Sequence, residues 1–147
     1  MNDIGYDQVI DRLEVRDKGA LTAKLQDLMC LFDSLKLCKF TLFGGVQVHH
    51  LVSWLNHVTG WEMRLEELLK CGERIFNLKR LYNIRCGISR KDDTLPPRIL
   101  SHKRKEGSAS DHLPHLGEML SQYYDYRGWS EEGIPLQTKL AELGLES

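Results

Sequence analysis

The chain has 147 residues, of which 41% are hydrophobic and 28% are charged, and its formal net charge is −1. These values are typical of one soluble globular domain, which at this length buries roughly 68–70% of its unfolded surface without disulfide support. They exclude a disordered tail and a collagen-like fibre, and the near-neutral charge gives no general attraction to nucleic acid.

No stretch approaches the roughly 18 apolar residues of a membrane span, so none is expected. The N-terminal residues 1–5 lack the basic and apolar regions of a secretory signal, which predicts a cytoplasmic protein. In a reducing compartment a free cysteine is most often a small buried apolar residue. The cysteines contain no C-x-x-C pair, so their spacing matches neither a zinc ribbon nor a ferredoxin. They are Cys30, Cys38, Cys71 and Cys86.

Apolar residues recur at steps of three and four along several segments, and this spacing predicts amphipathic helices. A weak pattern suggests a first helix over residues 6–15. The clearer helices are expected over 21–37, 48–58, 62–85 and 116–124, with a short last helix over 136–143. Sustained alternation of apolar and polar residues, the mark of a half-buried strand, is absent. The predicted fold is therefore all-α and multihelical, with residues 1–147 forming a single helical unit.

Glycines add detail to this pattern. Gly72 lies inside the longest predicted helix, where glycine costs roughly 0.5–1 kcal/mol relative to alanine. Close approach of a second helix is the usual reason, so we expect a helix–helix contact at Gly72. Gly87 is expected to cap this helix, and Gly128 and Gly144 to end the last two.

Histidine and charged clusters offer candidate sites, but a structural role is the simpler interpretation of each. Adjacent helical side chains point about 100° apart, so a metal could combine His57 with only one of His49 and His50. No carboxylate or cysteine completes such a set, so these histidines are expected to be structural. The basic run 102–105 is expected to be solvated, and the pair 92–93 to form a turn or helix cap.

Residues 123–129 are unusually aromatic. We expect the tyrosines to pack along one helix face and Trp129 to cover its end. A partly buried ion-pair network is expected among Arg85, Arg90, Asp92, Asp93 and Arg127. No nucleophile elbow, phosphate-binding loop or zinc-protease motif is present, so the residues alone predict no self-contained catalytic site.

Residues 33–38, with the sequence D-S-L-K-L-C, end the first clear helix. Three further segments, 72–85, 89–98 and 119–145, follow at defined spacings. Together the four segments resemble the C-terminal region of the tungsten-dependent aldehyde ferredoxin oxidoreductases, whose second pterin motif reads D-x-x-G-L-C. The similarity covers nearly the whole chain in the family's order. That region of the family is helical, in agreement with the periodicity.

The resemblance implies an oxidoreductase that converts an aldehyde to a carboxylic acid. In this family a tungsten held by two pterins does the oxygen-atom chemistry, and electrons pass to a 4Fe–4S cluster and then to ferredoxin. By position, Asp33 would hydrogen-bond the pterin, Leu37 would contact it through the main chain, and Cys38 would be the fourth thiolate ligand of the cluster. Lys36 stands at the motif's glycine, where a positive φ would make lysine costly.

The family's N-terminal pterin-clamping domain and its region with the other three cluster cysteines have no counterpart here. One cysteine cannot hold a 4Fe–4S cluster alone. We therefore expect the isolated chain to carry no cofactor and no catalytic residue, and to lack aldehyde oxidation activity. Its expected partners are the remainder of the oxidoreductase, ferredoxin and an aldehyde, with no nucleic acid or membrane. The alternative is a non-catalytic helical remnant or interaction domain without a cofactor.

Overall fold

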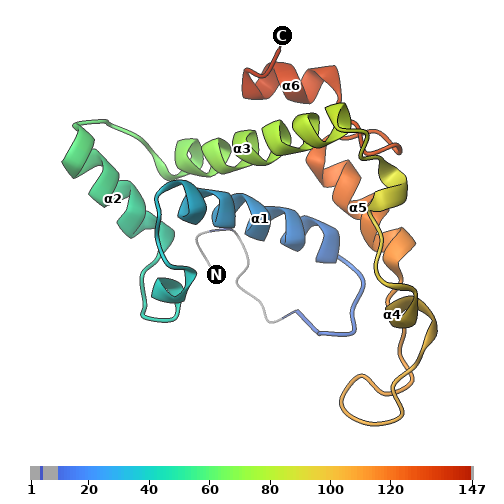
Figure 1. Ribbon diagram of the computed structural model, residues 1–147. Helices are drawn as coiled ribbons and strands as arrows, with labels where there is room; N and C mark the ends of the chain where they lie inside the picture. Colours follow the sequence, from blue (N-terminus) through green and yellow to red (C-terminus); the bar gives the residue numbers. More distant parts are fainter. Residues whose placement is uncertain (1–3, 5–9, 147) are drawn as a thin grey trace.

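The computed structural model describes Ile4 and residues 10–146, which fold into packed helices (Figure 1). The described residues contain no named strand, so the all-α prediction is confirmed. None of the described helices is long and apolar enough to cross a membrane. In chain order the helices are α1 (Lys18–Ser34), the 3-10 helix η2 (Lys39–Leu42), α2 (Val48–Thr59), α3 (Leu65–Arg85), the 3-10 helix η3 (Arg90–Asp92), α4 (Pro97–Ser101), α5 (Leu116–Arg127) and α6 (Gln137–Leu143).

Helix α1 is the centre of the fold because it packs against both α3 and α5. Figure 1 shows α1 and α3 side by side, with α2 at one end of the pair and α5 at the other. Helices α2 and α6 pack against α3. The core lies where these helices meet, and its buried apolar members are Ile4, Leu28, Leu31, Phe32, Val48, Leu51 and Leu68.

Two glycines let the central helices approach closely. A Cβ atom at Gly72 of α3 would collide with the carbonyl oxygen of Asp27 and lie 3.2 Å from Cγ of Leu31, both on α1. The predicted helix–helix contact at Gly72 is therefore confirmed. The sequence pattern did not indicate the equivalent role of Gly19, where a Cβ would lie 2.5 Å from the backbone nitrogen of Tyr123 on α5.

Helix α3 ends as predicted, at Gly87. This glycine has φ +88°, and the following Ile88 donates its backbone N–H to the Asn83 carbonyl at 3.0 Å. This is the Schellman arrangement, which satisfies the last carbonyls of a helix with a left-handed residue. Helix α1 ends in the same way, because Leu37 donates to the Phe32 carbonyl at 2.9 Å. There the left-handed residue is Lys36, with φ +57°.

Replacing Lys36 with glycine is expected to stabilise the chain by about 1 kcal/mol. A side chain in the left-handed region costs roughly 1–2 kcal/mol, and glycine returns part of that gain through its greater freedom in the unfolded state. Urea unfolding followed by circular dichroism measures the change. Lys39→Gly is the matched control, because Lys39 begins η2 and has no positive φ. An equal gain from both substitutions would show that the left-handed backbone of Lys36 is not the cause.

Two sequence-based expectations are corrected here. The helix expected over residues 6–15 is absent from its described part, residues 10–15, while residues 6–9 lie outside the described residues. In that part Asp11 Oδ1 accepts the Leu13 backbone N–H at 2.8 Å, and Glu14 Oε1 accepts that of Arg16 at 3.1 Å. Polar side chains thus satisfy the backbone in place of helical bonds. Conversely, residues 97–101, which lie outside every predicted helix, form α4, because Pro97 favours the first turn of a helix.

Candidate functional site

The motif turn, defined as residues 33–38, forms the exposed end of α1. Asp33 lies exposed in the last turn of the helix, and Leu37 is half-buried against the core. Cys38 is exposed and adopts an extended backbone, with φ −71° and ψ 125°, just before η2. The Thr41 hydroxyl donates to the Cys38 carbonyl at 2.8 Å and so holds the turn against η2. The structure thus brings the three sequence-predicted residues together in one accessible turn.

Only one of the four cysteines combines exposure with a place in this turn. Cys30 is 3% exposed inside α1, where its sulfur accepts a hydrogen bond from Lys79 Nζ at 3.4 Å. Cys71 is half-buried, and Cys86 is exposed at the far end of α3. No group of three or more histidines, cysteines or carboxylates among the described residues is arranged to hold a metal ion. Cys38 is thus the one cysteine whose thiol the motif turn exposes.

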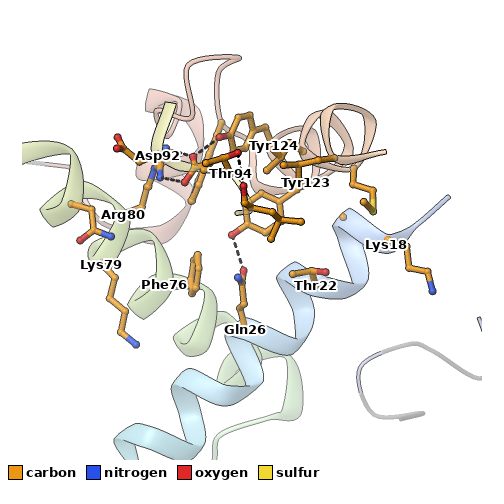
Figure 2. Close-up of a pocket in the computed structure, with 18 residues that line it drawn as sticks. Lys18, Thr22, Gln26, Phe76, Lys79, Arg80, Asp92, Thr94, Tyr123 and Tyr124 are labelled. Atoms are coloured by element: carbon orange, nitrogen blue, oxygen red, sulfur yellow. Dashed lines mark hydrogen bonds and ion pairs between the residues drawn. The ribbon is translucent and has the colours of Figure 1, made fainter. Parts of the chain in front are cut away.

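A separate cavity of about 650 Å³ lies between α1, α3 and α5 (Figure 2). Four aromatic side chains contribute to its wall. The lining residues include Thr22, Gln26, Phe76, Arg80, Asp93, Thr94, Leu116, Met119, Tyr123, Tyr124 and Trp129. Asp33, Leu37 and Cys38 do not line this cavity, so the two features are independent.

A fully buried arginine contacts several of the residues that line the cavity. Arg127 donates Nη1 to Asp27 Oδ1 at 2.6 Å and Nη2 to the Ala23 carbonyl at 3.0 Å. Nη2 also reaches Gln26 Oε1 at 3.0 Å, and Gln26 accepts the Tyr123 hydroxyl at 2.7 Å. Its guanidinium lies 4.1 Å from the centre of the Phe76 ring. Arg127 thus links α5 to α1. Its charge is paired with Asp27, and its guanidinium stacks on the Phe76 ring.

Burial raises the pKa of Asp27 from 3.8 to about 6, although Arg127 favours the charged carboxylate. Desolvation outweighs this attraction because taking the carboxylate out of water is costly even beside a cation. Burial is also the largest cause of the raised pKa of Tyr123.

A second ion pair fastens the loop after α3. Arg80 binds both carboxylate oxygens of Asp93, at 3.0 and 2.8 Å, and donates Nε to the Gly133 carbonyl at 2.8 Å. The Tyr124 hydroxyl donates to the same carboxylate. Trp129 lies under the Arg80 guanidinium and donates its indole N–H to Asn77 at 2.7 Å. The predicted packing at the end of α5 is confirmed for Tyr123, Tyr124 and Trp129, whose rings contact one another, whereas Tyr126 is 42% exposed.

The expected single ion-pair network is corrected. Arg127 pairs with Asp27, and Asp93 pairs with Arg80. The sequence pattern indicated neither Asp27 nor Arg80 as a partner. Asp92 caps η3 by accepting the Ser89 backbone N–H at 2.8 Å, as a turn role predicts. Nothing in the sequence distinguishes Asp27 from the other carboxylates in helices. Asp27 gains its ion pair only because α1 packs against α5.

His50 and His57 make local hydrogen bonds at α2. His50 Nδ1 accepts the Gln47 backbone N–H at 2.9 Å and so caps the start of α2. His57 Nδ1 lies 2.6 Å from the Ser53 carbonyl one helical turn earlier. These bonds agree with the predicted structural role of His50 and His57.

Comparison with known proteins identifies the chain's relatives. Residues 1–145 match the family described as aldehyde ferredoxin oxidoreductase, domains 2 and 3. The chain is 42% identical over 146 residues to the tungsten-containing aldehyde ferredoxin oxidoreductase of Pyrococcus abyssi, and 42% identical over 145 residues to that of Pyrococcus furiosus. Each match covers 97% of this chain and 24% of the relative. The chain therefore spans about a quarter of the length of these relatives.

A solved structure has a similar fold. It is the active site complex BamBC of benzoyl coenzyme A reductase in complex with 1,5-dienoyl-CoA, with a TM-score of 0.70 and 25% identity. The alignment covers 96% of this chain and 21% of that one. In both kinds of comparison the chain matches one part of a much larger polypeptide.

Proposed function

The chain belongs to the aldehyde ferredoxin oxidoreductase family, and we propose that it acts as the C-terminal portion of such an enzyme, with residues 1–147 as one helical unit. The observation that carries the proposal is the motif turn. The family match over residues 1–145 includes this exposed turn, in which the Asp33 carboxylate and the Cys38 thiol are both accessible. The remaining regions of the enzyme, ferredoxin and an aldehyde are the partners. The proposed location is the cytoplasm, where cysteines such as Cys38 stay reduced and can bind iron.

Within this proposal each residue of the motif turn has a role suited to its position. Asp33, exposed on the last turn of α1, accepts a hydrogen bond from the pterin. Leu37 offers its main-chain carbonyl, since its N–H already bonds the Phe32 carbonyl at 2.9 Å. Cys38 supplies the fourth thiolate of the 4Fe–4S cluster. The tungsten–pterin and the cluster supply oxygen-atom and electron-transfer chemistry when bound, and the chain's contribution is their placement.

The experiment uses a chimera in which this chain follows the part of the Pyrococcus abyssi relative that it does not match. We expect Cys38→Ser to remove the cluster's EPR signal and lower the iron content, because a hydroxyl is a poor ligand for iron. Cys30→Ser is the matched control. Cys30 lies eight residues earlier, inside α1, and its buried sulfur accepts a hydrogen bond from Lys79.

We expect Cys30→Ser to keep the iron and mainly to lower the free energy of unfolding. Equal iron loss from both substitutions, or loss from Cys30→Ser alone, would reject Cys38 as the ligand. The chain without the remaining regions is expected to show no aldehyde oxidation with an artificial electron acceptor, since it offers a single cluster ligand.

A further inference from the structure

The cavity between α1, α3 and α5 is larger than the gaps of an ordinary packed core. Its volume of about 650 Å³ lies within the range of roughly 300–1,000 Å³ that is typical of small-molecule pockets. Each of the three helices contributes one stripe of side chains to the wall, because residues three or four apart share a helix face. The chemistry of these stripes therefore indicates which molecule the cavity fits.

The α1 wall of the cavity offers hydrogen-bond donors. Its stripe consists of Lys18, Thr22 and Gln26. The side-chain oxygen of Gln26 already accepts hydrogen bonds from Tyr123 and Arg127. The Gln26 amide nitrogen and the Thr22 hydroxyl make no hydrogen bond to another described residue, and Gln26 points from α1 toward Tyr123 in Figure 2. Because these two groups can donate, this wall suits a hydrogen-bond acceptor such as a carboxylate.

The α5 wall is apolar and aromatic. Its stripe consists of Leu116, Met119, Leu120, Tyr123 and Tyr124. Phe76 of α3 and Trp129 add two nearly parallel rings to the lining, with centres 6.4 Å apart and planes inclined by 17°. Flat aromatic molecules are stabilised by stacking on such rings. The body of a molecule that fits this wall is therefore apolar and planar.

The charge of the lining favours an anion. The charged side chains that line the cavity are Lys18, Lys79, Arg80, Asp92 and Asp93, so the cations exceed the carboxylates by one. Arg80 and Asp93 pair with each other at 2.8 Å. Lys18 forms no ion pair with a described carboxylate. A molecule with a single negative charge would balance the lining.

We propose that this cavity is a binding site for a bicyclic aromatic monocarboxylate. The ring body lies against the α5 stripe, and the carboxylate accepts hydrogen bonds from Thr22 and Gln26. Asp33, Leu37 and Cys38 do not line the cavity, so the inference does not rest on the proposed function.

Isothermal titration calorimetry of the full chain with 2-naphthoate tests this assignment. We expect one molecule to bind per chain. The neutral 2-naphthamide should bind about tenfold more weakly, because hydrogen bonds to a charged acceptor are stronger. The cation 2-naphthylmethylammonium should not bind at the same concentrations. Equal affinities for all three molecules would overturn the proposal, since the carboxylate would then contribute nothing.

Substitutions of Thr22 locate the bound molecule, because this side chain is exposed at the cavity. Thr22→Trp should abolish binding of 2-naphthoate by filling the cavity. Thr138→Trp, at an exposed position of α6 outside the cavity, is the matched control and should bind like the unsubstituted chain. Thr22→Val keeps the shape of the side chain but removes its hydroxyl donor, so it should weaken binding about tenfold. Circular dichroism checks that the three variants fold alike.

Binding that survives Thr22→Trp would overturn the proposal. The molecule would then stack on rings outside the cavity, such as Trp54 and Trp61, which are 50% and 55% exposed.

The chimera described above separates this inference from the proposed function. It should bind 2-naphthoate with the affinity of the chain alone, and loss of binding there would overturn the proposal, because the rest of the enzyme would then cover the cavity. A chimera that binds 2-naphthoate, but whose cluster survives Cys38→Ser, would support this site and reject the ligand role of Cys38.

Discussion

Replacing Arg127 with methionine is expected to destabilise the chain by about 3–5 kcal/mol, because it leaves the Asp27 carboxylate buried without its partner. The total stability of a domain is typically about 5–15 kcal/mol, so this variant should be close to unfolding at 25 °C. The loss should be seen as a lower urea midpoint in circular dichroism. It arises because Arg127 is fully buried and bonds α1 at three acceptors.

The matched control removes both charges. Asp27→Leu combined with Arg127→Met should recover much of the lost stability, since a buried ion pair replaced by apolar side chains is often neutral. A double variant as unstable as Arg127→Met alone would show that the cost comes from lost packing of the guanidinium on Phe76, rather than from an unpaired carboxylate.

Substituting Gly72 with alanine is expected to cost about 1–3 kcal/mol, because the new methyl group must force α3 away from the α1 backbone. The atoms in its path belong to the Asp27 carbonyl, which cannot move aside like a flexible side chain. Thermal and urea unfolding of the variant measure the effect.

Gly117→Ala is the control, because nothing lies within 4 Å of a Cβ at this position in α5. There alanine should stabilise the helix by about 0.5–1 kcal/mol. A stabilisation at Gly72 like that at Gly117 would contradict the close approach of α1 and α3.

The sequence could predict the helices because their apolar residues face one core. The steps of three and four along α1, α2, α3 and α5 reflect that packing directly. The helix–helix contact at Gly72 could also be predicted. A glycine inside a long amphipathic helix lowers the stability of the helix, and close packing of a neighbouring helix is the usual reason for it. The failure over residues 10–15 shows the limit of periodicity, because local side-chain bonds from Asp11 and Glu14 replace the helix.

The charge network could not be predicted, because pairing depends on which helices meet. Asp27 and Arg127 are 100 residues apart, and Arg80 lies on α3 while Asp93 lies in the following loop. The cavity between α1, α3 and α5 has the same origin. The sequence places Lys36 at the motif's glycine, but only the structure gives its left-handed backbone.

Affinity purification of the chain from its source cell, followed by tungsten and iron analysis, tests the central claim most directly. If the chain is the C-terminal portion of an aldehyde ferredoxin oxidoreductase, it should purify together with a larger polypeptide, or as part of one, with tungsten and iron present. A colourless, metal-free monomer with no associated polypeptide would contradict the claim and favour a helical remnant without a cofactor.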